Sequence, residues 1–134
     1  KKIQDQLHAL GLHKKVRFYK VEHRDELPSI YKASDVLVSA ATTDGVPATF
    51  FEAMAMKVPV ITVHQPAYED YFQPGTHLLN CDSSLKNLSV LVKDLFTKSH
   101  LAHSLTTNAY ALSCQQVFEH KMHEVEQIYK DVVL

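Results

Sequence analysis

The chain has 134 residues, of which 46% are hydrophobic and 22% charged, and its formal net charge at pH 7 is -1. These values are typical of one globular domain with a buried core, so we expect residues 1–134 to form a single domain. The small net charge argues against a nucleic-acid partner, and no apolar run reaches the ~20 residues of a membrane-spanning helix. With no signal peptide at its start, the chain is expected to be cytoplasmic.

The first third of the chain shows helical and strand patterns in alternation. Residues 1–10 place apolar side chains on one helical face, and Gly11 is a natural stop. Residues 16–21 predict a strand. A short helix should follow, because Asp25, Glu26 and Pro28 suit a helix N-terminus.

Short apolar runs in the middle of the chain predict a parallel sheet. Residues 36–38 and 58–63 are almost wholly apolar, which suits central strands covered on both faces. Pro59 belongs at the beginning of its strand, and residues 77–81 predict the last strand. The alternation predicts an α/β fold: a Rossmann-like parallel sheet flanked by helices.

The remainder of the chain is helical by its hydrophobic periodicity. Three stripes recur at helical spacing, and we expect the third to be a buried face, within this domain or against another lobe. The stripes are Leu85, Leu88, Leu91, Val92 and Leu95; Leu101, Leu105, Ala109 and Leu112; and Phe118, Met122, Val125, Tyr129 and Val132.

Two carboxylates mark a candidate ligand site. Asp44 precedes a predicted helix and Glu52 lies inside it, with seven residues between them. A helix N-terminus offers unpaired N–H groups and a positive dipole to phosphate, and carboxylates accept hydrogen bonds from hydroxyl groups. The pair is a candidate site for a phosphorylated, polyhydroxylated ligand.

The sequence around these carboxylates resembles the retaining family-4 glycosyltransferases of GT-B fold. The segments that carry the resemblance are YKASDVLVS (31–39), DGVP (44–47), FEAMA (51–55) and PVI (59–61). The resemblance extends with lower specificity from residue 16 to the C-terminus. It implies that the chain is the C-terminal part of a GT-B lobe, the lobe that binds the donor.

The resemblance also implies a role for each site residue. Asp44 takes the catalytic position near the donor hexose, and Glu52 binds the ribose hydroxyl groups. Gly45, Ala48 and Thr49 contribute to the donor site where the diphosphate meets the helix. The donor is a nucleoside-diphosphate sugar, and neither a cofactor nor a metal is expected.

The implied activity is transfer of a hexosyl unit with retention in the complete enzyme. The expected partners are a nucleotide sugar and an N-terminal lobe that binds the acceptor. The resemblance also allows the complete enzyme to associate peripherally with a membrane through that lobe. The chain alone, as a fragment, is expected to be inactive. The alternative is a catalytically silent subunit or protein-interaction domain that keeps the fold.

Each site residue also has a purely structural interpretation. Asp44 and Gly45 could be only a turn, and Thr49 could cap the helix. Glu52 lies among apolar residues and needs a partner, for which an Arg or a backbone amide is the alternative to ribose. His100/His103 and His120/His123 have helical spacing, but solvated faces explain them better than a metal does.

The sequence departs from the family pattern at three places. Asp44 stands where a Glu is usual, and Lys57 replaces a usual Gly; if the backbone there has a positive φ, Lys57 bears a strain of about 1 kcal/mol. The loop at residues 64–69 lacks the usual glycines, although Glu69 matches an acidic residue that often follows them. Nothing before Val16 resembles the family segment that carries an Arg and a Lys for the diphosphate.

Overall fold

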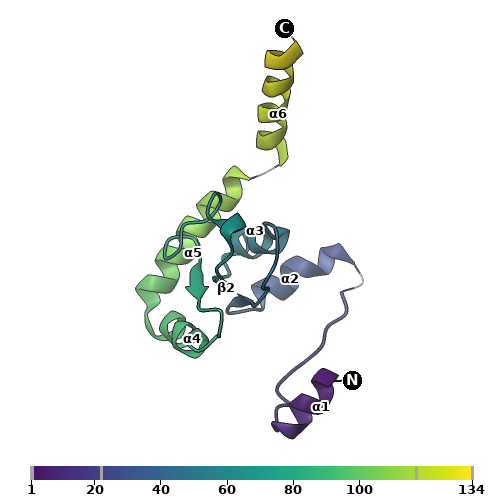
Figure 1. The fold of residues 1–134 in the computed structure, drawn as a ribbon, viewed down its shortest axis with the longest axis vertical. Helices are drawn as coiled ribbons and strands as arrows, with labels where there is room; N and C mark the ends of the chain where they lie inside the picture. The colour runs from purple at the N-terminus through teal and green to yellow at the C-terminus, as the bar shows by residue number, and fades with distance from the viewer. Residues whose placement is uncertain (1, 22, 117, 134) are drawn as a thin grey trace.

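The computed structural model describes residues 2–21, 23–116 and 118–133, which form helices around a small sheet (Figure 1). The elements in chain order are α1 (Lys2–Ala9), η1 (Arg24–Glu26), α2 (Leu27–Lys32), β1 (Leu37–Ser39), α3 (Ala48–Ala55), β2 (Val60–Val63), η2 (Pro66–Tyr68), β3 (Leu79–Cys81), α4 (Leu88–Thr97), α5 (Ser99–Gln115) and α6 (Phe118–Val133).

The sheet is parallel, with strand order β1-β2-β3, which confirms the predicted α/β class. All four residues of β2 are buried, as expected of a strand covered on both faces. The same expectation for residues 36–38 is wrong, because β1 lies at the edge of the described sheet and Val38 is 41% exposed. Residues 77–81 contain β3, which is shorter than predicted.

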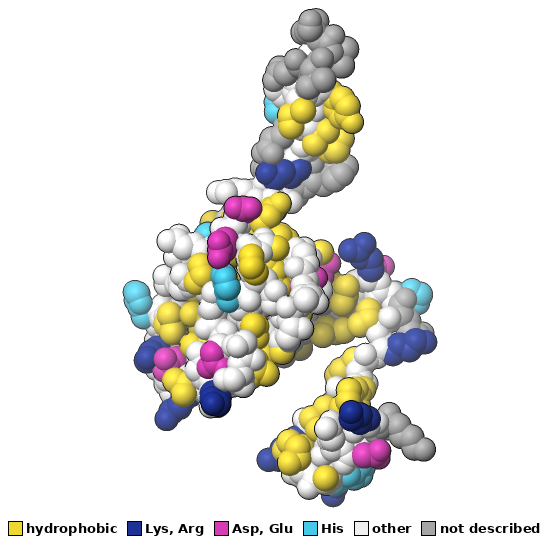
Figure 2. All heavy atoms as spheres, viewed as in Figure 1, with side chains coloured by type: hydrophobic (Ala, Val, Ile, Leu, Met, Phe, Trp, Pro, Cys, Tyr) yellow, Lys and Arg dark blue, Asp and Glu magenta, His cyan; other side chains and the backbone are white. Residues whose placement is uncertain are grey.

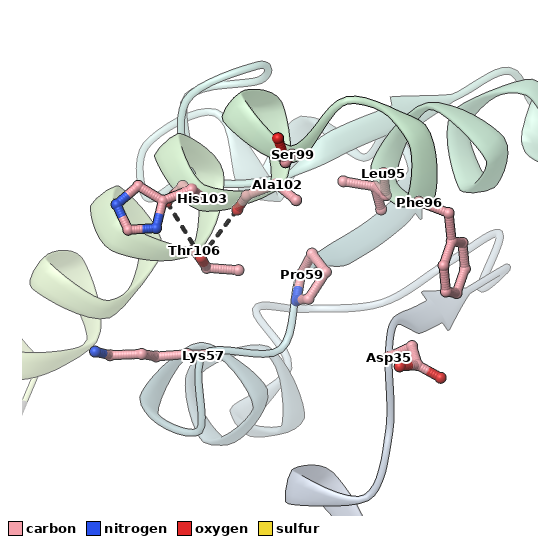
Figure 3. Close-up of a pocket in the computed structure, with 9 residues that line it drawn as sticks. All are labelled: Asp35, Lys57, Pro59, Leu95, Phe96, Ser99, Ala102, His103 and Thr106. Atoms are coloured by element: carbon pink, nitrogen blue, oxygen red, sulfur yellow. Dashed lines mark hydrogen bonds between the residues drawn. The ribbon is translucent and has the colours of Figure 1, made fainter.

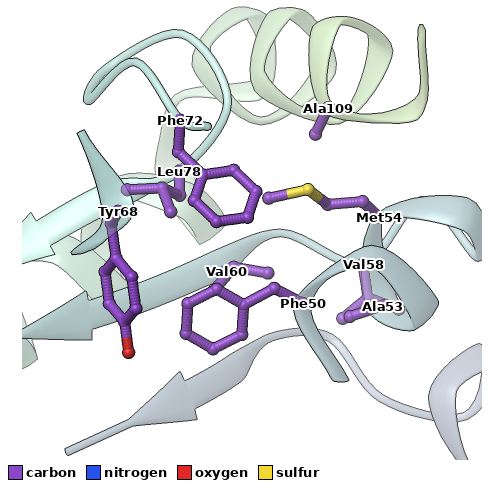
Figure 4. Packing of buried hydrophobic residues seen from close by; sticks show 9 residues of the cluster. All are labelled: Phe50, Ala53, Met54, Val58, Val60, Tyr68, Phe72, Leu78 and Ala109. Carbon is purple, nitrogen blue, oxygen red and sulfur yellow. The ribbon is translucent and has the colours of Figure 1, made fainter. Parts of the chain in front are cut away.

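Two hydrophobic clusters flank β2. Val60 and Ile61 are neighbours along the strand, so their side chains point to opposite faces, and each enters a different cluster. The first cluster contains the buried side of α3; the second contains Leu95 of α4 and Leu105 of α5. Figure 4 shows the first cluster, in which the members are Phe50, Ala53, Met54, Val58, Val60, Tyr68, Phe72, Leu78 and Ala109.

The strand predicted at residues 16–21 is absent from the structure. These residues have no strand conformation, and Phe18 and Tyr19 are 63% and 71% exposed. The apolar content suits a strand, but a strand forms only where its N–H and C=O groups pair with a neighbouring chain segment. The segment instead leads away from the sheet to α1, which ends before Gly11 as predicted (Figure 1).

Lys57 ends α3 in a left-handed conformation, with φ of 58°. The Lys57 N–H donates to the Met54 carbonyl (3.0 Å) and the Val58 N–H to the Ala53 carbonyl (2.9 Å), which is a Schellman motif. Glycine is the usual residue at this position because it has no Cβ. Lys57 therefore has the positive φ that was the condition for the expected backbone strain.

The third hydrophobic stripe lies on α6, which extends away from the sheet (Figure 1). Met122, Val125 and Tyr129 are 38%, 40% and 68% exposed, and Figure 2 shows hydrophobic side chains together on one side of this helix. The side chains of Phe118 and Val132 lie outside the described residues. The described part of the stripe is not buried within this chain.

The Lys57 conformation predicts a difference between two variants. Lys57→Ala keeps the Cβ and removes the ammonium group that lies 5.0 Å from the centre of the Tyr110 ring; Lys57→Gly removes both. We expect the glycine variant to have the larger free energy of unfolding, by about 1 kcal/mol, in urea denaturation. Equal values would show that the left-handed turn costs nothing here.

The exposure of the α6 stripe predicts how much two methionine substitutions lower the free energy of unfolding. Met122→Ala should lower the free energy of unfolding of the chain by less than about 1 kcal/mol, because little apolar surface is lost. The matched control is Met54→Ala, since Met54 is fully buried on α3; there the loss should be about 2–5 kcal/mol. A comparable loss at Met122 would place that residue in a core.

Candidate functional site

The site begins where β1 ends and α3 starts. Asp44 and Gly45 are exposed in the connecting loop, and Ala48 and Thr49 are exposed at the first positions of α3. Pro47 is the N-cap, and no side chain among the described residues caps the helix. Thr49 is therefore not the cap, and the first amide groups of α3 lie at an open helix end.

Space around this helix end is open as well. A Cβ built on Gly45 would meet no atom within 4 Å. The partial positive charge of the helix N-terminus is thus directed into an accessible region beside the carboxylate of Asp44.

Glu52 lies on the same face of α3 as Ala48, four residues earlier. Its side chain is 31% exposed. The Tyr31 hydroxyl donates a hydrogen bond to Oε2 of Glu52 (2.9 Å), and a terminal nitrogen of Arg24 lies 3.5 Å from Oε1. The expected need of Glu52 for a partner is confirmed, and the Arg alternative is present together with a tyrosine.

Tyr31 holds the Glu52 carboxylate in place and cannot lose its proton near neutral pH. Burial, the hydrogen bond to Glu52 and the negative charge of that carboxylate together raise the pKa of Tyr31 to about 12. The hydroxyl therefore remains a donor. Tyr31 belongs to the motif that carries the family resemblance, but spacing alone did not indicate that its hydroxyl meets Glu52.

A pocket of about 220 Å³ opens between α2 and α3, beside this carboxylate. Its walls are mostly apolar, and its polar lining residues are Glu52, Tyr31 and Arg24. The lining residues are Arg24, Leu27, Pro28, Tyr31, Glu52, Ala55 and Met56.

The loop after β2 adds a third set of side chains at the same edge of the sheet. Nε2 of His64 lies 3.1 Å from Oε1 of Glu69, and the Gln65 amide donates to the carbonyl of Ala41 (2.9 Å). The second hydrogen bond joins this loop to the loop that carries Asp44. Tyr68, at the end of η2 in this loop, is buried against Phe50.

Another cavity, of about 410 Å³, lies elsewhere (Figure 3). Asp35 and Pro59 in its lining precede β1 and β2, so it opens at the amino-terminal ends of the strands. Ligands of open parallel sheets bind at the carboxyl ends. The candidate site is therefore the region of Asp44, the α3 N-terminus and Glu52.

The described residues contain no group of three or more His, Cys, Asp and Glu side chains that could hold a metal ion. Among the same residues, no helix is both long and apolar enough to cross a membrane.

Comparison with solved structures finds the same fold in several glycosyltransferases. HepE of Anabaena, solved in complex with UDP-glucose, superposes with a TM-score of 0.82 over 96% of this chain, at 18% identity. Sucrose-phosphate synthase of Thermosynechococcus elongatus gives a TM-score of 0.86 over 98% of the chain, at 19% identity. The C-terminal domain of LpcC, a group 1 glycosyl transferase of Francisella tularensis, gives 0.73 over 86%, at 22% identity.

The matched regions are parts of longer chains. This chain spans 36% of HepE, 34% of sucrose-phosphate synthase and 60% of the LpcC domain chain. No sequence among the curated proteins matches it.

The family model for "Glycosyl transferases group 1" matches residues 1–112, which include every residue of the candidate site. Because the match takes in most of the chain and agrees with the GT-B fold, the chain belongs to the group 1 glycosyltransferases.

Proposed function

We propose that the chain is the donor-binding part of a retaining hexosyltransferase that uses a nucleoside-diphosphate sugar. The observation that carries the proposal is the uncapped N-terminus of α3, with Glu52 on the same face one turn further along. In this proposal an N-terminal lobe supplies the acceptor, and the two lobes together enclose the reaction.

The diphosphate would lie at the start of α3. The amide groups of Ala48 and Thr49 lie at the positive end of the helix dipole, which favours an anion by about 0.3–1 kcal/mol at an exposed site. The interaction between the helix dipole and the diphosphate strengthens as the leaving group gains negative charge in the transition state. The remaining neutralisation would come from the Arg and the Lys of the family segment that has no counterpart in residues 1–15.

The ribose would lie at Glu52. A carboxylate has about four positions that accept hydrogen bonds, two on each oxygen. Tyr31 occupies one position on Oε2 of Glu52, and Arg24 occupies at most one position on Oε1. The remaining positions can accept hydrogen bonds from two adjacent hydroxyl groups. Because Tyr31 fixes the carboxylate before the ligand arrives, little side-chain entropy is lost on binding.

The hexosyl unit would lie near Asp44, which is exposed on the loop before α3. Its carboxylate can accept hydrogen bonds from sugar hydroxyl groups and orient the ring for transfer. HepE, which shares the fold, is solved with UDP-glucose, and this supports a nucleotide sugar as the class of donor. The proposed chemistry needs no cofactor.

The Glu52 assignment predicts a loss of donor affinity. Glu52→Gln in the full-length protein should weaken nucleotide-sugar binding about 10- to 100-fold, since hydrogen bonds to charged groups contribute about 1.5–3 kcal/mol. Isothermal titration calorimetry measures the affinity.

The matched control is Asp94→Asn. Asp94 has a similar exposure, 29%, and also pairs with a basic side chain, but it lies on α4. This variant should bind like the wild type. Unchanged affinity in Glu52→Gln would remove Glu52 from the site, and absence of nucleotide binding by the wild type would favour the silent-subunit alternative.

A further prediction concerns residues 1–134 alone. They should transfer no sugar, because transfer requires donor and acceptor in near-attack geometry with water excluded, and the family's acceptor lobe is not in this segment. Nucleotide binding should be no tighter than about 1 mM. Incubation with labelled nucleotide sugars and an acceptor panel tests this; turnover above that of Glu52→Ala would contradict it.

A further inference from the structure

A cavity on the segment between β2 and β3 has polar and aromatic groups that the donor site does not use. Its volume is about 360 Å³, within the range of about 300–1,000 Å³ that is usual for small-molecule sites. The lining lies within residues 69–77, so it shares no residue with the Asp44 loop, with α3 or with the pocket beside Glu52. The lining residues that bear on a ligand are Glu69, Asp70, Tyr71 and His77.

Tyr71 presents an aromatic ring at this cavity. Its side chain is 47% exposed, whereas its neighbour Phe72, also in the lining, is buried. Phe72 packs against Phe50 and Phe51 of α3, with ring centres 5.9 Å and 5.2 Å apart, and Figure 4 shows its ring within the hydrophobic cluster. The centre of the Tyr71 ring lies 6.4 Å from that of Phe72. An exposed ring is therefore supported by an anchored one.

Glu69 supplies a carboxylate that is already held in position. His64, which directly follows β2, places Nε2 3.1 Å from Oε1 of Glu69, and its Nδ1 lies 3.4 Å from the side-chain nitrogen of Asn80 on β3. Because a carboxylate only accepts hydrogen bonds, the neutral ring carries its hydrogen on Nε2 and accepts from Asn80 at Nδ1. One contact with His64 leaves about three of the four acceptor positions of Glu69 open to a ligand.

His77 supplies a hydrogen-bond donor to the same cavity. The backbone N–H of Gln73 donates to Nδ1 of His77 (3.1 Å), so the hydrogen of the neutral ring is on Nε2. Burial lowers the pKa of His77, which favours the neutral ring at pH 7. The N–H of His77 in turn donates to the Gln73 carbonyl (2.9 Å), and this closes the turn that carries the ring.

These groups fit an uncharged sugar, or one that carries an amine, better than an anion or a metal ion. The described lining contains the carboxylates of Glu69 and Asp70 and neither Lys nor Arg, so phosphate groups would be repelled. No group of acidic, His and Cys side chains that could hold a metal ion occurs in the described part of the chain. A pyranose offers hydroxyl groups that both donate and accept, and a C–H face that can lie on an aromatic ring.

We propose that this cavity is a saccharide-binding site, separate from the donor site, that takes a hexose without an anionic group. The ring of Tyr71 stacks on one face of the sugar. Glu69 and Asp70 accept hydrogen bonds from its hydroxyl groups, and Nε2 of His77 donates to one of them. The hexose is either a free sugar or a residue of a longer glycan. The inference goes beyond the proposed function and does not rest on it, because no group of the donor site takes part.

Saturation-transfer NMR titrations of the full-length protein test this. The probes are glucose, galactose, mannose, glucosamine and N-acetylglucosamine, with maltotriose and cellotriose as glycans and glucose 6-phosphate as the anionic counterpart. Tyr71→Ala removes the ring, and Glu69→Gln removes the charge at nearly constant shape; both side chains are exposed, so the fold should be kept. The matched control is Tyr110→Ala, a tyrosine that is 40% exposed on α5.

At least one neutral or amine-bearing probe should bind the wild type, and Tyr71→Ala should weaken that binding about tenfold and Glu69→Gln about fivefold. Glucose 6-phosphate should bind more weakly than glucose. Tighter binding of the two trisaccharides than of glucose would identify a glycan as the ligand, and equal binding a single hexose. Tyr110→Ala should bind like the wild type.

Three outcomes would overturn the proposal: no probe binds the wild type, neither cavity variant weakens binding, or Tyr110→Ala weakens it equally. A separate calorimetric titration with uridine, guanosine and adenosine diphosphates distinguishes this failure from that of the proposed function. Diphosphate binding should be the same in Tyr71→Ala as in the wild type. Its loss in Tyr71→Ala would show that the cavity is not separate from the donor site, and its absence in the wild type would overturn the proposed function alone.

Discussion

The site depends on the burial of one face of α3. Phe50, Ala53 and Met54 are at most 1% exposed and pack against the sheet and α5, which fixes the rotation of the helix about its axis. With that face buried, Ala48 and Glu52 necessarily lie toward the accessible side. The apolar packing therefore determines where the polar groups can meet a ligand, although none of the packed side chains would contact it.

Much of this arrangement could be predicted from local sequence. The apolar run of β2 indicated a strand covered on both faces, and the residues around Glu52 indicated a largely buried helix in which a carboxylate needs a partner. The position of Lys57 was identified through the glycine that the family has there, and its φ of 58° agrees. These features depend on neighbouring residues, whose spacing the sequence contains.

The features that sequence did not predict depend on residues far apart along the chain. Tyr31 and Glu52 are 21 positions apart, and their hydrogen bond follows from how α2 packs on α3. Residues 16–21 were misassigned for a related reason: an apolar pattern indicates that a segment can pair, and the fold decides whether a neighbouring strand is present.

The exposed edge of β1 has a consequence for how the chain behaves in concentrated solution. On the side away from β2, its backbone groups have no strand partner among the described residues, and Val38 is partly exposed. Such an edge can pair with the same edge of another molecule, which is a common route to aggregation. A short strand of three residues limits this tendency, but a lysine or proline introduced at the edge would be the natural means of suppressing it.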